Sequence, residues 1–111
     1  MDNEYEVKIT RQALEQMRSI IYYVSHDLMA LEAAEKLLKD LQSSIMKLAV
    51  LPKRHSLIDE EPGRSEGIRK IIVKNFFVYY WVDDENNKVH VIAVIYSKRD
   101  QIKQLADMDM Q

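Results

Sequence analysis

Residues 67–100 read GIRKIIVKNFFVYYWVDDENNKVHVIAVIYSKRD, and they decide the fold. Three runs within them, 68–74, 76–82 and 89–96, are rich in the β-branched and aromatic side chains that favour strands. The last two runs are joined by residues 83–88, DDENNK, which have the polar chemistry of a hairpin turn. The stretch therefore predicts an antiparallel meander with cations at the start of its first strand and just after its last.

Upstream of the meander, apolar residues recur every three or four positions, which predicts two helices. Thr10 is a suitable N-cap for the first, and Ser25-His26-Asp27 is typical of a corner between the two. Leu51-Pro52 should end the second, because proline cannot extend the helical ladder. A seam of only about three heptads favours an antiparallel hairpin over a coiled-coil dimer. The seam residues are Leu14, Met17, Ile21, Val24 and Leu28 in the helix predicted over 11–26, and Leu31, Ala34, Leu38, Leu41, Ile45 and Leu48 in the helix predicted over 29–50.

Residues 5–9 alternate between apolar and polar side chains, as in a half-buried strand. The predicted class is therefore α+β, as one domain over residues 1–111: an N-terminal strand, an antiparallel helical hairpin and a three-stranded antiparallel meander, in the order β-α-α-β-β-β. We expect a four-stranded, mostly antiparallel sheet with the hairpin on one face. Residues 53–67 are predicted to form a long loop of a kind that is often functional. A short helix after Asp100 is compatible with the sequence.

Simple alternation along the last strand divides its side chains between two faces. Both faces are largely apolar, so one should meet the helices and the other should be a second buried surface or a docking surface. The first face is predicted to hold Val89, Val91, Ala93 and Ile95, and the second His90, Ile92, Val94 and Tyr96.

Composition places the chain among soluble globular proteins, with 47% hydrophobic and 31% charged residues. The absence of cysteine excludes disulfides and thiolate metal sites and favours the reducing cytoplasm. The N-terminus lacks the pattern of a signal peptide, and no apolar run is long enough for a membrane span. A net charge of −2 gives little general attraction for nucleic acid. Cations nevertheless gather at Lys53, Arg54, Arg64, Arg69, Lys70 and Lys74, and again at Lys98, Arg99 and Lys103.

Common catalytic and binding motifs are missing, and no metal or cofactor is predicted. His26, His55 and His90 have no partner at metal-ligand spacing, and two glycines cannot build a phosphate-binding loop. Metal-independent attack of an RNA 2′-hydroxyl on its phosphate needs only a proton acceptor, a proton donor and positive charge. Arg69 and Lys70 point to opposite faces of one strand, so they cannot both line one such site. Candidates for this chemistry are His55, Arg69, Tyr96 and Arg99, each of which also has an ordinary structural explanation in a loop or at the rim of a sheet.

The order and spacing of these elements resemble the RelE/ParE superfamily, the toxins of bacterial type II toxin–antitoxin systems of the plasmid-stabilisation kind. The resemblance covers nearly the whole chain, and residues 1–111 are read as one toxin domain. It implies a growth inhibitor of the bacterial cytoplasm whose partner is a cognate antitoxin. The residues that carry it are Gly67-Ile68-Arg69, Lys74-Asn75-Phe76, Tyr79-Tyr80-Trp81-Val82-Asp83 and Tyr96-Ser97-Lys98-Arg99-Asp100.

The resemblance implies two alternative activities. RelE-like members cut mRNA in the ribosomal A site with lysines in the first meander strand, an arginine in the second, an arginine after the last and a tyrosine in a C-terminal helix. Here Lys70 matches the first feature, and Lys98 or Arg99 the third. Phe77 stands near the place of the second-strand arginine, and residues 101–111 contain no aromatic. An ending that begins with Tyr96 is closer to ParE-like members, which inhibit DNA gyrase by binding.

The favoured interpretation is therefore a ParE-like toxin that binds an essential target such as DNA gyrase. The alternative is a RelE-like, metal-independent endoribonuclease that acts on mRNA at the ribosome, and a third is a degenerate toxin that retains only antitoxin binding. Whether the protein is an enzyme stays open between these. The expected target-binding residues are Arg54, Lys70, Lys74, Lys98 and Arg99.

Overall fold

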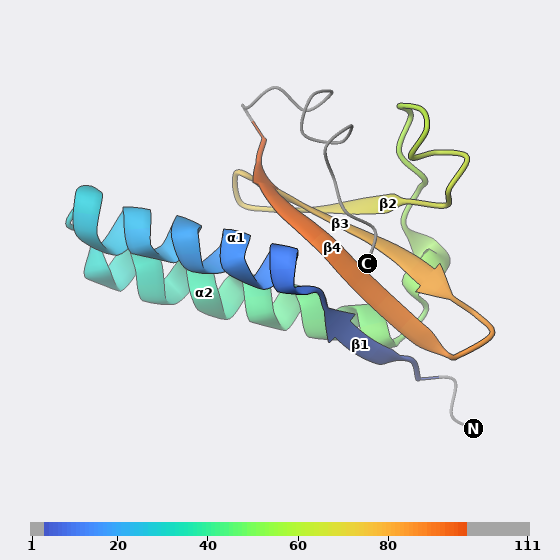
Figure 1. Ribbon diagram of the computed structural model, residues 1–111. Coiled ribbons are helices and arrows are strands. Elements are labelled where there is room, and N and C mark those ends of the chain that lie inside the picture. The colour runs from blue at the N-terminus through green and yellow to red at the C-terminus, as the bar shows by residue number, and fades with distance from the viewer. Residues whose placement is uncertain (1–3, 98–111) are drawn as a thin grey trace.

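The computed structural model describes residues 4–97, in which a strand and a helical hairpin precede a three-stranded meander (Figure 1). The short helix considered after Asp100 lies outside the described residues, as do Lys98 and Arg99. Short helical turns at Tyr23–Asp27 (π), Lys47–Ala49 (3-10) and Pro52–Arg54 (3-10) connect the main elements. The main elements are β1 (Glu6–Ile9), α1 (Arg11–Tyr22), α2 (Leu31–Met46), β2 (Arg69–Val73), β3 (Phe76–Asp83) and β4 (Lys88–Tyr96).

The four strands form one sheet in the order β1-β4-β3-β2. β1 runs parallel to β4, and the other two pairs are antiparallel. The α1–α2 hairpin lies along one face of this sheet (Figure 1). The predicted α+β class, the order of elements and the mostly antiparallel sheet are therefore confirmed, and the predicted meander strands agree with the observed ones to within a residue.

β4 departs from the predicted alternation because it contains a β-bulge at Ile92. Tyr79 pairs with Ala93 and Tyr80 pairs with Val91, so Ile92 is the extra residue between them. An inserted residue exchanges the two faces of the strand beyond it. Val94 consequently joins Val89 and Val91 in the core beneath the helices, while Ile92, Ala93 and Ile95 lie in a second cluster on the outer face. The predicted division of faces is therefore correct through Ile92 and wrong from residue 93 onward.

The predicted burial of the helical seams is confirmed in the middle of the hairpin and is wrong at its tip. Ala13 and Met17 of α1 and Leu41 and Ile45 of α2 are buried against the sheet. The hairpin extends beyond the sheet at the end where α1 turns into α2 (Figure 1). Side chains there have no sheet to pack on, which leaves Leu28 55% exposed and Leu31 62% exposed.

The helices also differ from the prediction in their bounds and in which residues are buried: α1 ends at Tyr22, before the predicted 26, and α2 begins at Leu31, after the predicted 29. Leu14 is 39% exposed because α1 turns its preceding residue, Ala13, toward the sheet. The regular part of α2 ends at Met46, before the predicted 50, because the chain tightens into the 3-10 turn and Leu51 then takes a left-handed conformation with φ of 49°. Leu51-Pro52 therefore marks the start of the next turn rather than the last residues of the helix.

α1 is attached to β4 at the bulge. The predicted N-cap is confirmed, since Thr10 Oγ1 accepts from the Ala13 N–H at 3.2 Å. In the first turn of α1, Gln12 Nε2 donates to the Ile92 carbonyl at 2.9 Å, and one turn later Gln16 Oε1 accepts from the Val94 N–H at 2.8 Å. β1 ends at Ile9, so these glutamines take over the edge of β4 that a longer β1 would have paired.

Candidate functional site

Arg69 and Tyr80 hold the backbone of the turn at residues 52–55. Arg69 begins β2, and its Nη1 donates to the carbonyls of His55 and, at 3.3 Å, of Lys53. Tyr80, its partner across the β2–β3 ladder, donates its buried hydroxyl to the Pro52 carbonyl at 2.6 Å. The sheet therefore fixes this turn through main-chain oxygens, and the side chains of Lys53 and Arg54 are left exposed.

His55 lies in this turn among cations. Its ring meets the Tyr80 ring edge-on, with centroids 6.4 Å apart. Burial, followed by the charges of Arg54 and Arg69, lowers the pKa of His55 because all three disfavour the imidazolium. Within residues 4–97 no carboxylate is hydrogen-bonded or ion-paired to the ring. The imidazole is therefore neutral at neutral pH and lacks the carboxylate that orients a catalytic histidine.

Tyr96 lies at the other end of the sheet from this turn. It pairs with Phe76 across the β3–β4 ladder, and the two ring centroids are 5.5 Å apart. Arg69 pairs with Tyr80 on β3, and Tyr80 pairs with Val91 on β4. Tyr96 lies five residues further along β4 than Val91, which is roughly 15 Å at the rise of a strand. The structure thus brings His55 and Arg69 together and places Tyr96 apart from them, while Arg99 lies outside the described residues.

The expected target-binding cations are dispersed as well. Arg54 Nη1 donates to the Val50 carbonyl at 2.7 Å, on the turn. Lys70 points to the outer face, where its Nζ lies 4.1 Å from the centroid of the Phe77 ring, so it is on the opposite face from Arg69 as predicted. Lys74, in the β2–β3 turn, forms an ion pair of 3.3 Å with Asp40 of α2. These three cations therefore occupy three different places, and Lys98 is beyond the described part of the chain.

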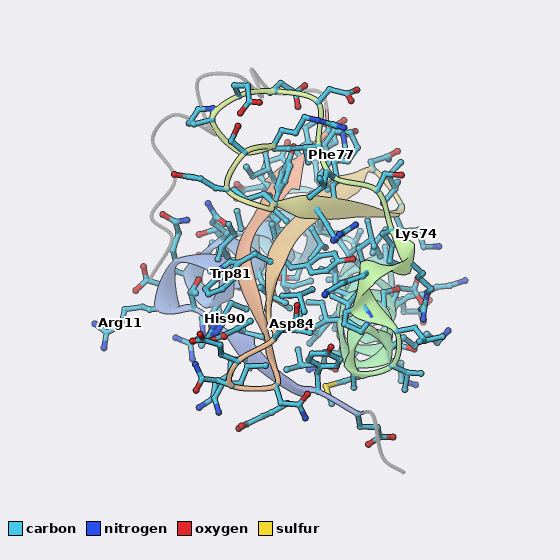
Figure 2. The ribbon with its side chains drawn as sticks, turned by 90° about the vertical axis from the view of Figure 1, so that its right-hand side faces the viewer. Arg11, Lys74, Phe77, Trp81, Asp84 and His90 are labelled. Atoms are coloured by element: carbon cyan, nitrogen blue, oxygen red, sulfur yellow. The ribbon has the colours of Figure 1, made fainter. Side chains whose placement is uncertain are left out.

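The outer face of the sheet carries several rings, of which Phe77, Trp81 and His90 are labelled in Figure 2. Trp81 stacks on His90 with centroids 4.5 Å apart, and His90 Nε2 lies 3.4 Å from Asp83 Oδ2. Phe77, on the same face, meets Tyr79 edge-on. Three lysines share this face, but Lys8 and Lys88 both form ion pairs with Glu6 and Lys70 lies over a ring. Stacked rings and paired charges give the face the character of a packing or docking surface.

A groove of about 1030 Å³ lies where the hairpin extends past the sheet. Its walls come from α1, α2, the β2–β3 turn and the end of β4. Sequence reasoning missed it, because it is created by the overhang of the tip and by the bulge that turns Val94 inward. Its apolar lining includes Ile20, Val24, Leu37, Phe76 and Val94, and its polar lining Gln12, Glu15, Gln16, Lys36 and Lys74.

The described helices include none that is both long and apolar enough to cross a bilayer. Across residues 4–97, histidine and carboxylate side chains nowhere gather in threes at metal-binding distance.

Tyr80→Phe should destabilise the protein by about 1–3 kcal/mol, because the buried Pro52 carbonyl would lose its donor. Tyr5→Phe is the matched control, since it removes an exposed hydroxyl bonded to Asp84 and should change stability by less than about 0.5 kcal/mol. Urea unfolding of both variants measures the difference. Equal losses of stability in the two variants would show that the hydrogen bond from Tyr80 to the turn does not stabilise the fold more than an exposed hydrogen bond does.

Comparison with known proteins connects this geometry to a family. The family model described as ParE toxin of type II toxin-antitoxin system, parDE, matches residues 7–101. No curated protein matches the sequence significantly.

Three solved structures of similar fold, each from a different bacterium, illustrate the match. The chromosomal ParDE system from P. aeruginosa includes a chain with 19% identity and a TM-score of 0.69, and the match covers 87% of this chain and 100% of that one. A mutant of the E. coli toxin RelE in the free state has 18% identity and a TM-score of 0.60, with 91% of this chain and 92% of that one covered. The toxin–antitoxin complex RelBE2 from Mycobacterium tuberculosis includes a chain with 18% identity and a TM-score of 0.55, and the match covers 84% of this chain and 98% of that one.

Proposed function

The chain belongs to the ParE toxin family of type II toxin–antitoxin systems, and on this premise we propose that it inhibits growth by docking on DNA gyrase rather than by cutting RNA. It is the toxin component of such a pair. Both the family model and the ParDE structure belong to the ParE branch of the superfamily, for which the resemblance implies inhibition of gyrase by binding. Its inhibition would be a matter of affinity, with no bond made or broken.

The observation that carries this proposal is the distance between the candidate catalytic groups. Phosphoryl transfer requires the base, the acid and the charge-stabilising cation to converge within hydrogen-bond reach of one phosphate. Tyr96 lies five residues along β4 from the strand position level with Arg69. The Arg69 guanidinium is already engaged by two carbonyls of the 52–55 turn. This arrangement supports docking.

The groove beside the hairpin suits the proposed antitoxin. Its lining is mostly apolar, with amide and charged groups from Gln12, Gln16 and Lys36. An amphipathic helix is recognised by such a surface, because its apolar side fills the floor and its polar side meets the rim. The similar ParDE and RelBE2 structures are both toxin–antitoxin systems, which supports a cognate antitoxin here, and we expect a stable complex when the two proteins are expressed together.

The mechanism is tested with purified protein in two assays, one of DNA supercoiling by gyrase and one of ribosome-bound mRNA. We expect supercoiling to be inhibited and mRNA to stay intact. Tyr96→Phe and His55→Ala should then inhibit gyrase as the wild type does, because neither moves a proton. Arg54→Ala should weaken inhibition, and the deficit should shrink as salt is raised, because an exposed charge contact is screened.

Two results would contradict the proposal that the protein acts by docking through Arg54. Cleavage of mRNA at ribosomes that falls by roughly 10²–10⁴ in Tyr96→Phe or His55→Ala would establish proton transfer and the ribonuclease alternative. Inhibition of gyrase that is unaffected by Arg54→Ala at every salt concentration would remove Arg54 from the target contact.

A further inference from the structure

β2 is an edge strand, and most of its outer side is open. One side pairs with β3, and β2 is the last strand of the sheet. On the other side, the Leu57–Arg69 bridge and the Ile58 N–H to Ile68 carbonyl bond, 2.9 Å long, cover only the beginning of the strand. The part of β2 that leads into the β2–β3 turn is not covered by them.

The register shows which backbone groups face this open side. Val73 pairs with Phe76 around the two-residue Lys74-Asn75 turn, and the pair that closes such a turn exchanges ladder hydrogen bonds. The Ser97 N–H donates to the Asn75 carbonyl at 2.9 Å, so the backbone carbonyl of Asn75 points toward β4. The backbone groups of the next residue, Phe76, must then point toward β2, as the hydrogen-bonded Val73–Phe76 pair requires. Because the direction alternates along a strand, Ile72 points its N–H and C=O away from β3. Among residues 4–97, no backbone bond to another segment engages either group of Ile72.

The side chains on this edge also indicate a place where another strand could add. Ile72 is 68% exposed, more than any other apolar side chain in the described strands. Lys70 precedes it on the same face of the strand, and Lys74 follows it in the turn. An exposed apolar residue on an open edge invites a further strand, and flanking lysines limit which strand can add.

Charge decides between a second copy and a different partner. Antiparallel pairing of two β2 edges centred on Ile72 would place Lys70 of one copy opposite Lys74 of the other, and like charges in direct opposition are destabilising. An acidic residue opposite Lys70 would be favoured instead.

We propose that the open edge of β2 takes an extended segment of a partner protein by strand addition, with an apolar residue over Ile72 and an acidic residue two positions along, opposite Lys70. Main-chain hydrogen bonds to Ile72 would provide the attachment, and the two side-chain contacts the selectivity. This surface is separate from the groove and does not depend on gyrase being the target.

The test uses the folded protein and a defined probe, the capped peptide Thr-Glu-Thr-Ile-Thr-Glu-Thr. We expect the backbone amide resonances of residues 69–73 to shift on titration and exchange of the Ile72 amide hydrogen to slow. A peptide with both Glu replaced by Lys should bind at least about tenfold more weakly. Shifts centred on the groove, equal binding of both peptides, or no binding at about 1 mM would overturn the proposal.

Variants separate the backbone contribution from the side-chain contribution. Ile72→Pro removes the outward N–H and leaves the β2–β3 ladder intact, and proline is tolerated at such edge positions, so peptide binding should fall at least about tenfold. Lys70→Glu, which leaves the backbone unchanged, should reverse the preference between the acidic and the basic peptide even if Ile72→Pro folds poorly. Leu31→Thr, which changes a comparably exposed apolar residue at the start of α2, should bind as the wild type does.

Two results would contradict the choice of partner. Peptide binding by Ile72→Pro at wild-type strength would exclude strand addition. A concentration-dependent dimer in sedimentation experiments that Ile72→Pro abolishes would identify a second copy of the chain as the occupant. Gyrase inhibition is measured separately, so its failure would leave the peptide result standing.

Discussion

Leu41→Ala is expected to lower the free energy of unfolding by about 2–5 kcal/mol. Leu41 is 0% exposed in the middle of α2 and belongs to the core between the helices and the sheet. Truncation there removes apolar contacts and leaves a cavity that the surrounding close-packed side chains can only partly fill. Urea unfolding followed by circular dichroism gives the difference, since this chain is of a size at which two-state unfolding is usual.

Two further leucines of α2 calibrate this result. Leu38, which the sequence placed in the same seam, is only partly buried, so Leu38→Ala should cost less than Leu41→Ala. Leu31 is 62% exposed, and Leu31→Ala should change stability by less than about 0.5 kcal/mol. A loss below about 1 kcal/mol for Leu41→Ala would mean that the helices do not pack on the sheet as described.

Alkaline pH should also destabilise the protein strongly. Burial raises the pKa of both Tyr79 and Tyr80 from 10.0 to about 12. Between these values the unfolded chain has lost both phenolic protons while the folded chain still holds them, so rising pH favours unfolding. The stability is fully present below pH 10 and is lost as pH rises through about 12. Two pKa units correspond to roughly 2–3 kcal/mol for each ring.

The contribution of one ring is isolated by comparing the wild type with Tyr80→Phe across this range. Lysines titrate in the same range in both proteins, so their effect cancels in the difference. The free energy of unfolding should fall less steeply in Tyr80→Phe than in the wild type, and ultraviolet titration should show late ionisation of one tyrosine fewer. Parallel pH profiles for the two proteins would contradict the raised pKa of Tyr80.

Most of the fold could be predicted from local sequence patterns. The three meander strands, the first strand and the Thr10 cap are encoded by side-chain composition and short-range spacing, and all of them are where the sequence put them. The bulge at Ile92 is different, because its neighbours Val91, Ala93 and Val94 are all apolar. An extra residue leaves no trace in a run of uniformly apolar side chains, so its effect on the two faces could not be predicted.

The candidate site shows a similar limit. Sequence reasoning separated Arg69 from Lys70 correctly, because opposite faces follow from strand periodicity alone. It could not foresee that Arg69 would bind the Lys53 and His55 carbonyls, since backbone oxygens are present at every residue and have no signature in the sequence. Nor could it place Tyr96 relative to His55, because that distance depends on how the 52–55 turn folds back on the sheet.

The way in which Arg69 and Tyr80 hold that turn has an evolutionary consequence. Their bonds end on the main-chain oxygens of Pro52, Lys53 and His55, which persist whatever side chains those positions carry. Lys53 does form an ion pair with Asp84, but exposed pairs contribute little to stability. Mutation can therefore change the exposed side chains at 53 and 54 while the backbone beneath them keeps its shape, so related proteins can diverge in what they recognise without losing the ability to fold.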